Sequence, residues 1–145
     1  MYHKKRTMEN HQLQFVTFDQ AKSLKALGFD WPCSVRYDDE RLFKTFFANH
    51  NEFGFDDLAS APTVALALQW CRDVKKYCFG IIPVLSDLII ETQSRITLYI
   101  PTIRKEFDGY FKCTDLKSES TYESAESALL DELLISSNSL ILPNQ

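Results

Sequence analysis

The chain has 145 residues, of which 45% are hydrophobic, 13% aromatic and 25% charged. This length and composition are those of one globular domain, which excludes a mainly disordered chain and removes the need for a stabilising disulfide or metal. The formal net charge of −4 argues against a dominant nucleic-acid-binding role, although a local basic patch stays compatible with it.

The sequence also bears on the compartment in which the protein works. No apolar run reaches the length of a membrane span, and the polar, basic start lacks the apolar stretch of a secretory signal. The four cysteines are scattered along the chain without a paired short spacing. We therefore expect a cytoplasmic protein with reduced thiols and no disulfide.

The N-terminal part predicts a tail followed by a helix. Residues 1–12 are polar and basic with no apolar period, so we expect a flexible basic tail ahead of one domain over residues 13–142. Thr17 and Gln20 have the spacing of a capping box, apolar residues then recur at helical spacing, and a glycine follows as a natural stop. These features predict a helix over residues 18–27.

Residues 34–60 have the weakest pattern in the chain. Val35 and Tyr37 suit a short strand, and an acidic turn follows them. Four large apolar residues then fit one side of a short helix, but a strand or an ordered loop is compatible with them too: Leu42, Phe43, Phe46 and Phe47. The sequence leaves the structure of this segment open.

The second half begins with another helix. Pro62 suits a first-turn position, and an apolar stripe from Val64 to Val74 follows, which together predict a helix over residues 62–76. The last helix, expected over about residues 121–135, is indicated by a capping box and a repeating apolar face.

Three β-rich runs lie between these helices. Pro101 is expected to end or bend the middle strand, and the polar residues 104–106 to form the next turn. Short connections favour an antiparallel meander, with strands at about 78–85, 95–101 and 107–114. The predicted fold is therefore α+β: this small three-stranded sheet carries helices 62–76 and 121–135 on one face, and helix 18–27 is added to them.

Three sequence segments together resemble a known group of proteins. They are Leu24-x-x-Leu27-Gly28-Phe29-Asp30-Trp31-Pro32-Cys33, then Ala61-Pro62-Thr63-x-x-Leu66-Ala67-x-x-Trp70-Cys71-Arg72, then Thr121-Tyr122-Glu123-x-Ala125. In this order and spacing they resemble short uncharacterised proteins of Bacteroides-type gut bacteria, their mobile elements and phages. That group has no assigned activity, so the resemblance implies only a context: a small accessory protein of a phage or mobile element.

Residues that could carry catalysis or bind a metal do not form a known motif. No pair among the cysteines and histidines has zinc-ligand spacing, and no glycine-rich phosphate loop is present, so we expect neither a metal nor a cofactor. Cys33 and His50 could form a nucleophilic dyad, but we favour a packed Cys33 and a solvent-exposed His50. The acidic pairs in the loops, such as Asp38-Asp39 and Asp56-Asp57, are expected to be solvated turn residues rather than catalytic ones.

Two charged regions are candidates for binding. A small excess of positive charge between the second helix and the last strand could contact nucleic acid through Lys75, Lys76, Arg104 and Lys105, if these lie on one face. The acidic last helix and the apolar C-terminal residues could instead contact another protein, through Glu123, Glu126, Leu140, Ile141 and Leu142.

The sequence thus predicts a binding protein rather than an enzyme. The leading hypothesis is a non-enzymatic interaction protein whose partner is another protein. The first alternative is a nucleic-acid-binding protein that uses the sheet. The second is a small enzyme that uses Cys33 or the loop carboxylates.

Overall fold

The computed structural model describes residues 13–86, 96–107 and 110–139, and within them the chain is an α+β fold of three α-helices and two three-stranded antiparallel sheets. The elements in chain order are α1 (Phe18–Ala26), β1 (Cys33–Asp38), β2 (Arg41–Ala48), the 3₁₀ helix η1 (His50–Phe53), β3 (Leu58–Ser60), α2 (Val64–Asp73), β4 (Cys78–Ser86), β5 (Ile96–Phe107), β6 (Tyr110–Asp115) and α3 (Tyr122–Ser139).

The β4–β5–β6 sheet confirms the predicted antiparallel meander. Its middle strand is longer than expected, because β5 continues through Pro101 and residues 104–106 to Phe107, so the predicted turn at 104–106 was wrong. Pro101 has no N–H to donate, and it is tolerated in β5 because the pairing with β6 ends beside it. Asp115 is the last β6 partner, opposite Thr102, and the Pro101 carbonyl then accepts a hydrogen bond from the Leu116 amide.

The second sheet, β1–β2–β3, comes from the segment that the sequence left open. The strand expected around Val35 and Tyr37 is β1, the central strand of this sheet. The short helix considered for residues 42–47 was wrong, since these residues belong to β2 and pair with β1. An irregular register between Cys33 and Val35 gives β2 extra residues, which hides the period of two that marks a strand.

Helix α1 begins at the cap that the sequence indicates, whereas α2 begins two residues later than expected. Thr17 and Gln20 form both hydrogen bonds of the capping box at α1. At α2 the Thr63 hydroxyl accepts the Leu66 amide, so the helix starts at Val64 and Pro62 precedes the cap instead of lying in the first turn. The last helix, α3, runs to Ser139, four residues beyond the expected end at 135.

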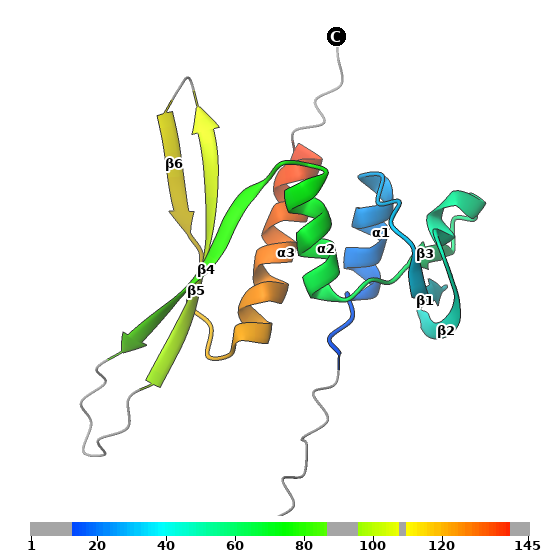
Figure 1. Ribbon diagram of the computed structural model, residues 1–145, viewed down its shortest axis with the longest axis horizontal. Helices are drawn as coiled ribbons and strands as arrows, with labels where there is room; N and C mark the ends of the chain where they lie inside the picture. Colours follow the sequence, from blue (N-terminus) through cyan, green and yellow to red (C-terminus); the bar gives the residue numbers. More distant parts are fainter. Residues whose placement is uncertain (1–12, 87–95, 108–109, 140–145) are drawn as a thin grey trace, which may run out of the picture.

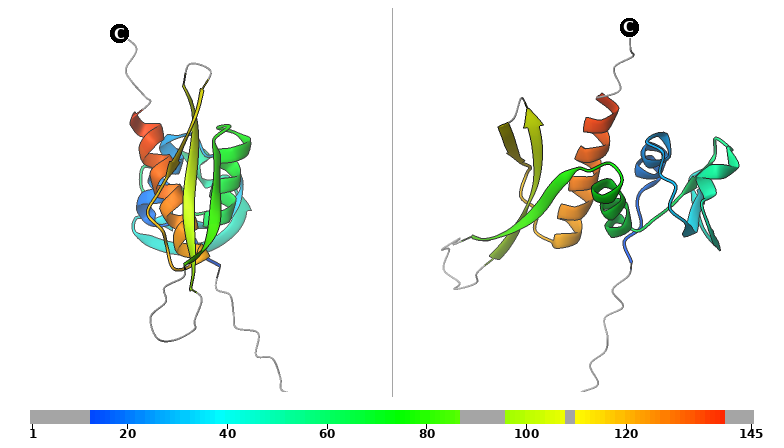
Figure 2. Two further views of the ribbon diagram at one scale, coloured as in Figure 1. Left: turned by 90° about the vertical axis from the view of Figure 1, so that its left-hand side faces the viewer. Right: turned by 45° about the horizontal axis from the view of Figure 1, so that its top comes forward.

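The two sheets lie at opposite ends of the molecule, and the helices lie between them (Figure 1). Helices α2 and α3 cover one face of the β4–β5–β6 sheet, as predicted, and lie behind it when that sheet faces the viewer (Figure 2, left). Helix α1 separates them from the β1–β2–β3 sheet.

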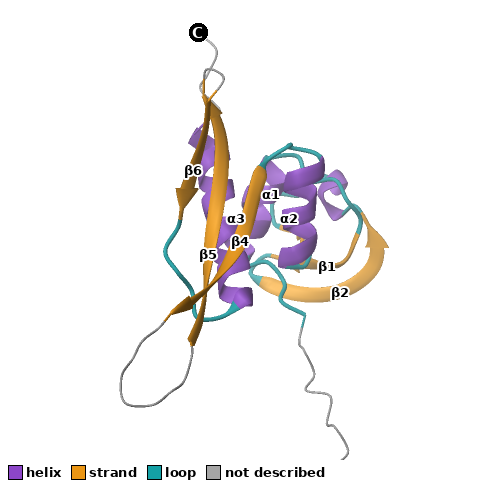
Figure 3. Ribbon diagram, turned by 60° about the vertical axis from the view of Figure 1, so that its left-hand side comes forward, coloured by secondary structure: helices purple, strands orange, loops and turns teal. Residues whose placement is uncertain are grey.

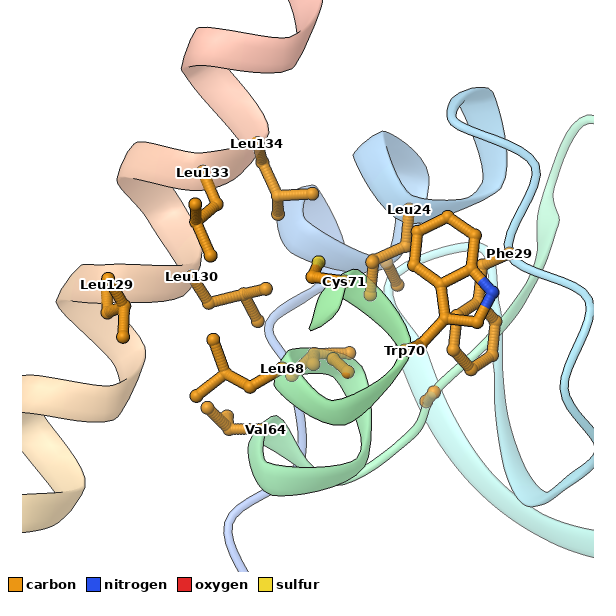
Figure 4. Close-up of a cluster of buried hydrophobic side chains, with 14 of the residues drawn as sticks. Leu24, Phe29, Val64, Leu68, Trp70, Cys71, Leu129, Leu130, Leu133 and Leu134 are labelled. Atoms are coloured by element: carbon orange, nitrogen blue, oxygen red, sulfur yellow. The ribbon is translucent and has the colours of Figure 1, made fainter. Parts of the chain in front are cut away.

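One hydrophobic core connects these layers. Leucines of α3 meet Leu68 and Val64 of α2, and Leu24 of α1 lies beside Cys71 (Figure 4). Trp70 and Phe29 are both 1% exposed, and their ring centroids are 5.3 Å apart. Each large buried ring and leucine contributes about 1.5–3 kcal/mol of transfer free energy, so these residues hold the layers together.

Candidate interaction surface

The β1–β2 hairpin brings two acidic stretches together. Asp38 of β1 pairs with Arg41 of β2, and the turn between them contains Asp39 with a φ of 57°. Aspartate adopts this left-handed conformation more readily than most residues. The Asp39 amide donates a 2.8 Å hydrogen bond to the Asp57 carbonyl, which fixes the loop before β3 against the turn.

Strand β2 and the segment after it expose large apolar side chains. Their exposed fractions run from 44% for Leu42 to 71% for Phe47. We name this set the β2 surface: Leu42, Phe43, Phe46, Phe47, Phe53 and Phe55.

Four of these side chains belong to β2, which within the described residues pairs only with β1. Leu42 lies opposite Tyr37 and Phe43 lies opposite Arg36, so the two apolar residues point to opposite faces of the sheet. Strand β2 is the outer strand of its sheet and curves around the end of the molecule (Figure 3). Apolar side chains are therefore presented on both faces of one accessible edge.

Hydrogen bonds of His50 and Asn51 fix the segment that follows β2. His50 is fully buried, and its Nε2 lies 3.0 Å from the carbonyl oxygens of both Cys33 and Phe46. Both neighbours are acceptors, so Nε2 carries the proton and donates. The next residue, Asn51, donates to the Phe29 carbonyl at 2.8 Å and accepts the Ser60 amide at 2.9 Å. Helix η1 is thus tied to the core and to β3.

Two rings of the β2 surface, those of Phe46 and Phe53, pack against His50. The Phe46 and Phe53 ring centroids lie 5.3 and 6.0 Å from that of His50, and 6.4 Å from each other. The Lys25 ammonium donates to the carbonyls of Phe55 and Leu58, which anchors the following loop to α1. The Phe46 and Phe53 rings and the backbone at Phe55 are therefore positioned before any partner binds, which lowers the entropy cost of binding.

One end of the β2 surface is strongly acidic. Between residues 38 and 57 the sequence has six carboxylates and two basic residues, Arg41 and Lys44, which leaves −4 with His50 neutral. Five of the six gather where the hairpin turn meets the loop before β3, and we name them the acidic end: Asp38, Asp39, Glu40, Asp56 and Asp57.

The geometry does not support the Cys33–His50 dyad. His50 is buried rather than solvent-exposed, so that expectation was wrong, and its Nε2 contacts the Cys33 carbonyl oxygen rather than the thiol. The Cys33 thiol points to the Trp31 carbonyl at 3.6 Å, and burial raises its pKa from 9.0 to about 11. A thiol with this pKa is not ionised near neutral pH and is a poor nucleophile.

The four basic candidates gather at one end of the β4–β5–β6 sheet. Lys75 and Lys76 lie just before Cys78, and Cys78 pairs with Arg104. Arg104 and Lys105 are neighbours in β5 and so point to opposite faces, which means that the four do not form one flat face. The Lys75 ammonium also lies 5.5 Å from the Trp70 ring centroid.

The acidic candidates of α3 lie elsewhere. Glu123 is exposed in the first turn, whereas Glu126 is half-buried, and burial together with the Glu123 charge raises the pKa of Glu126. Glu126 lines a groove of about 270 Å³ between α2, β4 and α3, and Arg72 on the α2 side stacks 4.9 Å from the Phe79 ring centroid. The remaining candidates, Leu140, Ile141 and Leu142, lie outside the described residues.

The described residues contain no metal-binding cluster, and no known relative points to a site. Among the described residues, no group of three or more His, Cys, Asp or Glu side chains is arranged to hold a metal ion. No helix in that part of the chain has the length and apolar character needed to cross a membrane. No protein-family model, curated protein or solved structure matches this chain.

Reasoning from the sequence missed the β2 surface. The sequence left residues 42–47 open between a short helix, a strand and an ordered loop, and none of these alternatives was considered as a binding surface. The usable signal was the density of large apolar residues between positions 42 and 55, combined with carboxylates at both ends and no helix cap.

Proposed function

We propose that this chain is a non-enzymatic binding protein that recognises a segment of another protein through the β2 surface. The observation that carries the proposal is the exposure of six large apolar side chains, four of them on the edge strand β2 and two in the segment that follows it. The core has its own buried aromatic and leucine residues, so the β2 surface is a surplus of apolar area beyond what the core buries.

The size of the β2 surface supports a protein partner. Aromatic side chains present about 150–250 Å² each, so six side chains at these exposures offer roughly 600 Å². A patch of this size is at the upper limit for a monomer and approaches the ~800 Å² that each partner contributes to a standard interface. Exposed phenylalanines also favour binding through apolar contacts over recognition of phosphate groups.

The test is a selection of displayed random peptides of about ten residues, which is enough for a strand at the upper end of the usual range. The selection uses the wild-type protein, and binding is then measured with a variant that removes two rings without changing charge, Phe47→Ser/Phe55→Ser. A matched control removes two equally exposed apolar side chains elsewhere, Leu13→Ser/Ile135→Ser.

We expect selected peptides to lose at least about tenfold in affinity on the β2 variant and to bind the control normally, since central apolar contacts are worth about 1–3 kcal/mol each. If the selection yields no binder, or if its binders ignore the Phe47→Ser/Phe55→Ser change, the proposal is wrong.

A second candidate function is nucleic-acid binding at the basic end of the β4–β5–β6 sheet. The observation that favours it is the pairing of Cys78 with Arg104, since Lys75 and Lys76 shortly precede Cys78 and Lys105 follows Arg104. It predicts that single-stranded RNA or DNA binds with an affinity that falls steeply with salt, and that Lys75→Gln/Lys76→Gln weakens binding. Absence of binding at low salt would remove this candidate.

A further inference from the structure

The edge of β2 offers backbone as well as side-chain contacts. Within the described residues β2 pairs only with β1, and the sheet order is β2–β1–β3. In an antiparallel ladder every second residue of an edge strand directs its N–H and C=O groups outward. Over Arg41–Lys44, where the pairing with β1 is regular, the outer edge of β2 therefore presents donors and acceptors between apolar side chains above and below the sheet.

We propose that the partner is an extended segment of another protein that adds to β2 as a fourth strand, with an apolar centre and basic residues at the end that meets the acidic end. This inference rests on the proposed function and specifies its partner. Main-chain hydrogen bonds to β2 provide affinity, and side-chain contacts on alternate faces provide selectivity.

The distribution of apolar side chains favours a strand over a helix. A helix buries one stripe and would contact only one face of the sheet edge. Leu42 and Phe43 lie on opposite faces, and an added strand, whose side chains also alternate, covers both.

The charges along β2 indicate which residue types suit the centre and the ends of the added strand. The five carboxylates of the acidic end lie beside Arg41, at the start of β2. Lys44 lies in the middle of β2, so a basic residue directly opposite it would be repelled. Neutral apolar residues therefore suit the centre of the partner segment, and lysines or arginines suit the end near the hairpin turn.

The same charges argue against a second copy of this chain as the occupant. Antiparallel pairing of two β2 edges about a twofold axis would place each acidic end beside the Ala48 end of the other copy. The sequence has no lysine or arginine between residues 45 and 57, so a second copy would leave the acidic end without a complementary charge, which disfavours that partner.

The experiment uses synthetic peptides of about ten residues with one apolar alternating centre and three different ends: lysine-rich, neutral or glutamate-rich. Affinity is measured by fluorescence anisotropy. The protein is wild type, the β2 variant Phe47→Ser/Phe55→Ser, or a variant that neutralises most of the acidic end, Asp39→Asn/Glu40→Gln/Asp56→Asn/Asp57→Asn. Asparagine keeps the left-handed conformation at position 39 accessible. A control variant neutralises four carboxylates elsewhere, Asp73→Asn/Glu119→Gln/Glu123→Gln/Glu132→Gln.

A second set of peptides tests the strand geometry. The lysine-ended peptide is N-methylated at alternate residues in the two opposite phases, which blocks either the N–H groups facing β2 or those facing solvent. An added strand loses binding in one phase only, because only one set of N–H groups reaches the protein.

We expect the lysine-ended peptide to bind about tenfold or more tightly than the neutral one, and to lose this advantage on the acidic-end variant but not on the control. The advantage is also expected to shrink between about 0.05 M and 0.5 M salt.

Three results overturn the inference and leave the proposed function standing: binding lost with Phe47→Ser/Phe55→Ser but independent of the peptide's end, equal loss in both N-methylation phases, or acid-ended peptides binding best. Concentration-dependent dimerisation of the wild type that Phe47→Ser/Phe55→Ser abolishes would instead assign the edge to a second copy. Failure of every peptide to distinguish wild type from the β2 variant would remove the proposed function itself.

Discussion

Two phenylalanines allow one substitution to be compared in opposite environments. Phe29 is 1% exposed, its ring packs on Trp70 at 5.3 Å, and its carbonyl accepts the Asn51 side chain. Phe47 is 71% exposed. We predict that Phe29→Ala lowers the free energy of unfolding by about 3–5 kcal/mol, which combines lost burial with the remaining cavity. Phe47→Ala is expected to change it by about 0.5 kcal/mol or less.

The measurement is urea unfolding followed by intrinsic fluorescence, with the free energy extrapolated to water and the m value compared between variants. A loss of about 3–5 kcal/mol would be a large share of the 5–15 kcal/mol that a domain typically has. If Phe47→Ala costs about 2 kcal/mol or more, Phe47 packs inside the folded chain and the β2 surface is not free for a partner.

Other predictions concern the hydrogen bonds of Asn51 and the cysteine thiols. Asn51→Ala removes two hydrogen bonds, so we expect a loss of about 2–4 kcal/mol by the same urea assay, and a loss under about 0.5 kcal/mol would contradict its bridging role. Iodoacetamide is expected to label exposed Cys78 and Cys113 in the folded protein and to reach Cys33 and Cys71 only after unfolding, as mass spectrometry can show. Burial raises the pKa of Cys33 and of Cys71 to about 11, so the unfolded chain loses these protons first, and stability should fall as pH rises from about 9 to 11. That fall is at most about 1.4 kcal/mol per pH unit for each thiol, and it should be shallower in Cys71→Ala; an unchanged slope would show that other groups cause it.

Local signals in the sequence were sufficient for most of the fold. The Thr17–Gln20 capping box, the stripe from Val64 onward and the β-rich runs act through contacts between residues near in sequence, and these elements have the predicted type. Errors arose where tertiary contacts decide the outcome. Pro101 stays within a strand because β6 ends beside it, which no local pattern reveals.

The candidate surface was harder to predict for a physical reason. A strand that buries one face shows alternating polarity, but β2 exposes apolar residues on both faces and has an irregular register. Its apolar residues therefore fit helical spacing as well as strand spacing. His50 likewise gives no sequence signal of burial, since its environment is made by the carbonyls of Cys33 and Phe46 and the rings around it.

Hydrogen–deuterium exchange with and without a selected peptide tests the central claim most directly. The claim predicts that the peptide slows exchange within residues 41–48 of β2, leaves β4 and β5 unchanged, and has no effect on the Phe47→Ser/Phe55→Ser variant. Slowed exchange confined to the β4–β5–β6 sheet, with β2 unaffected, would contradict it.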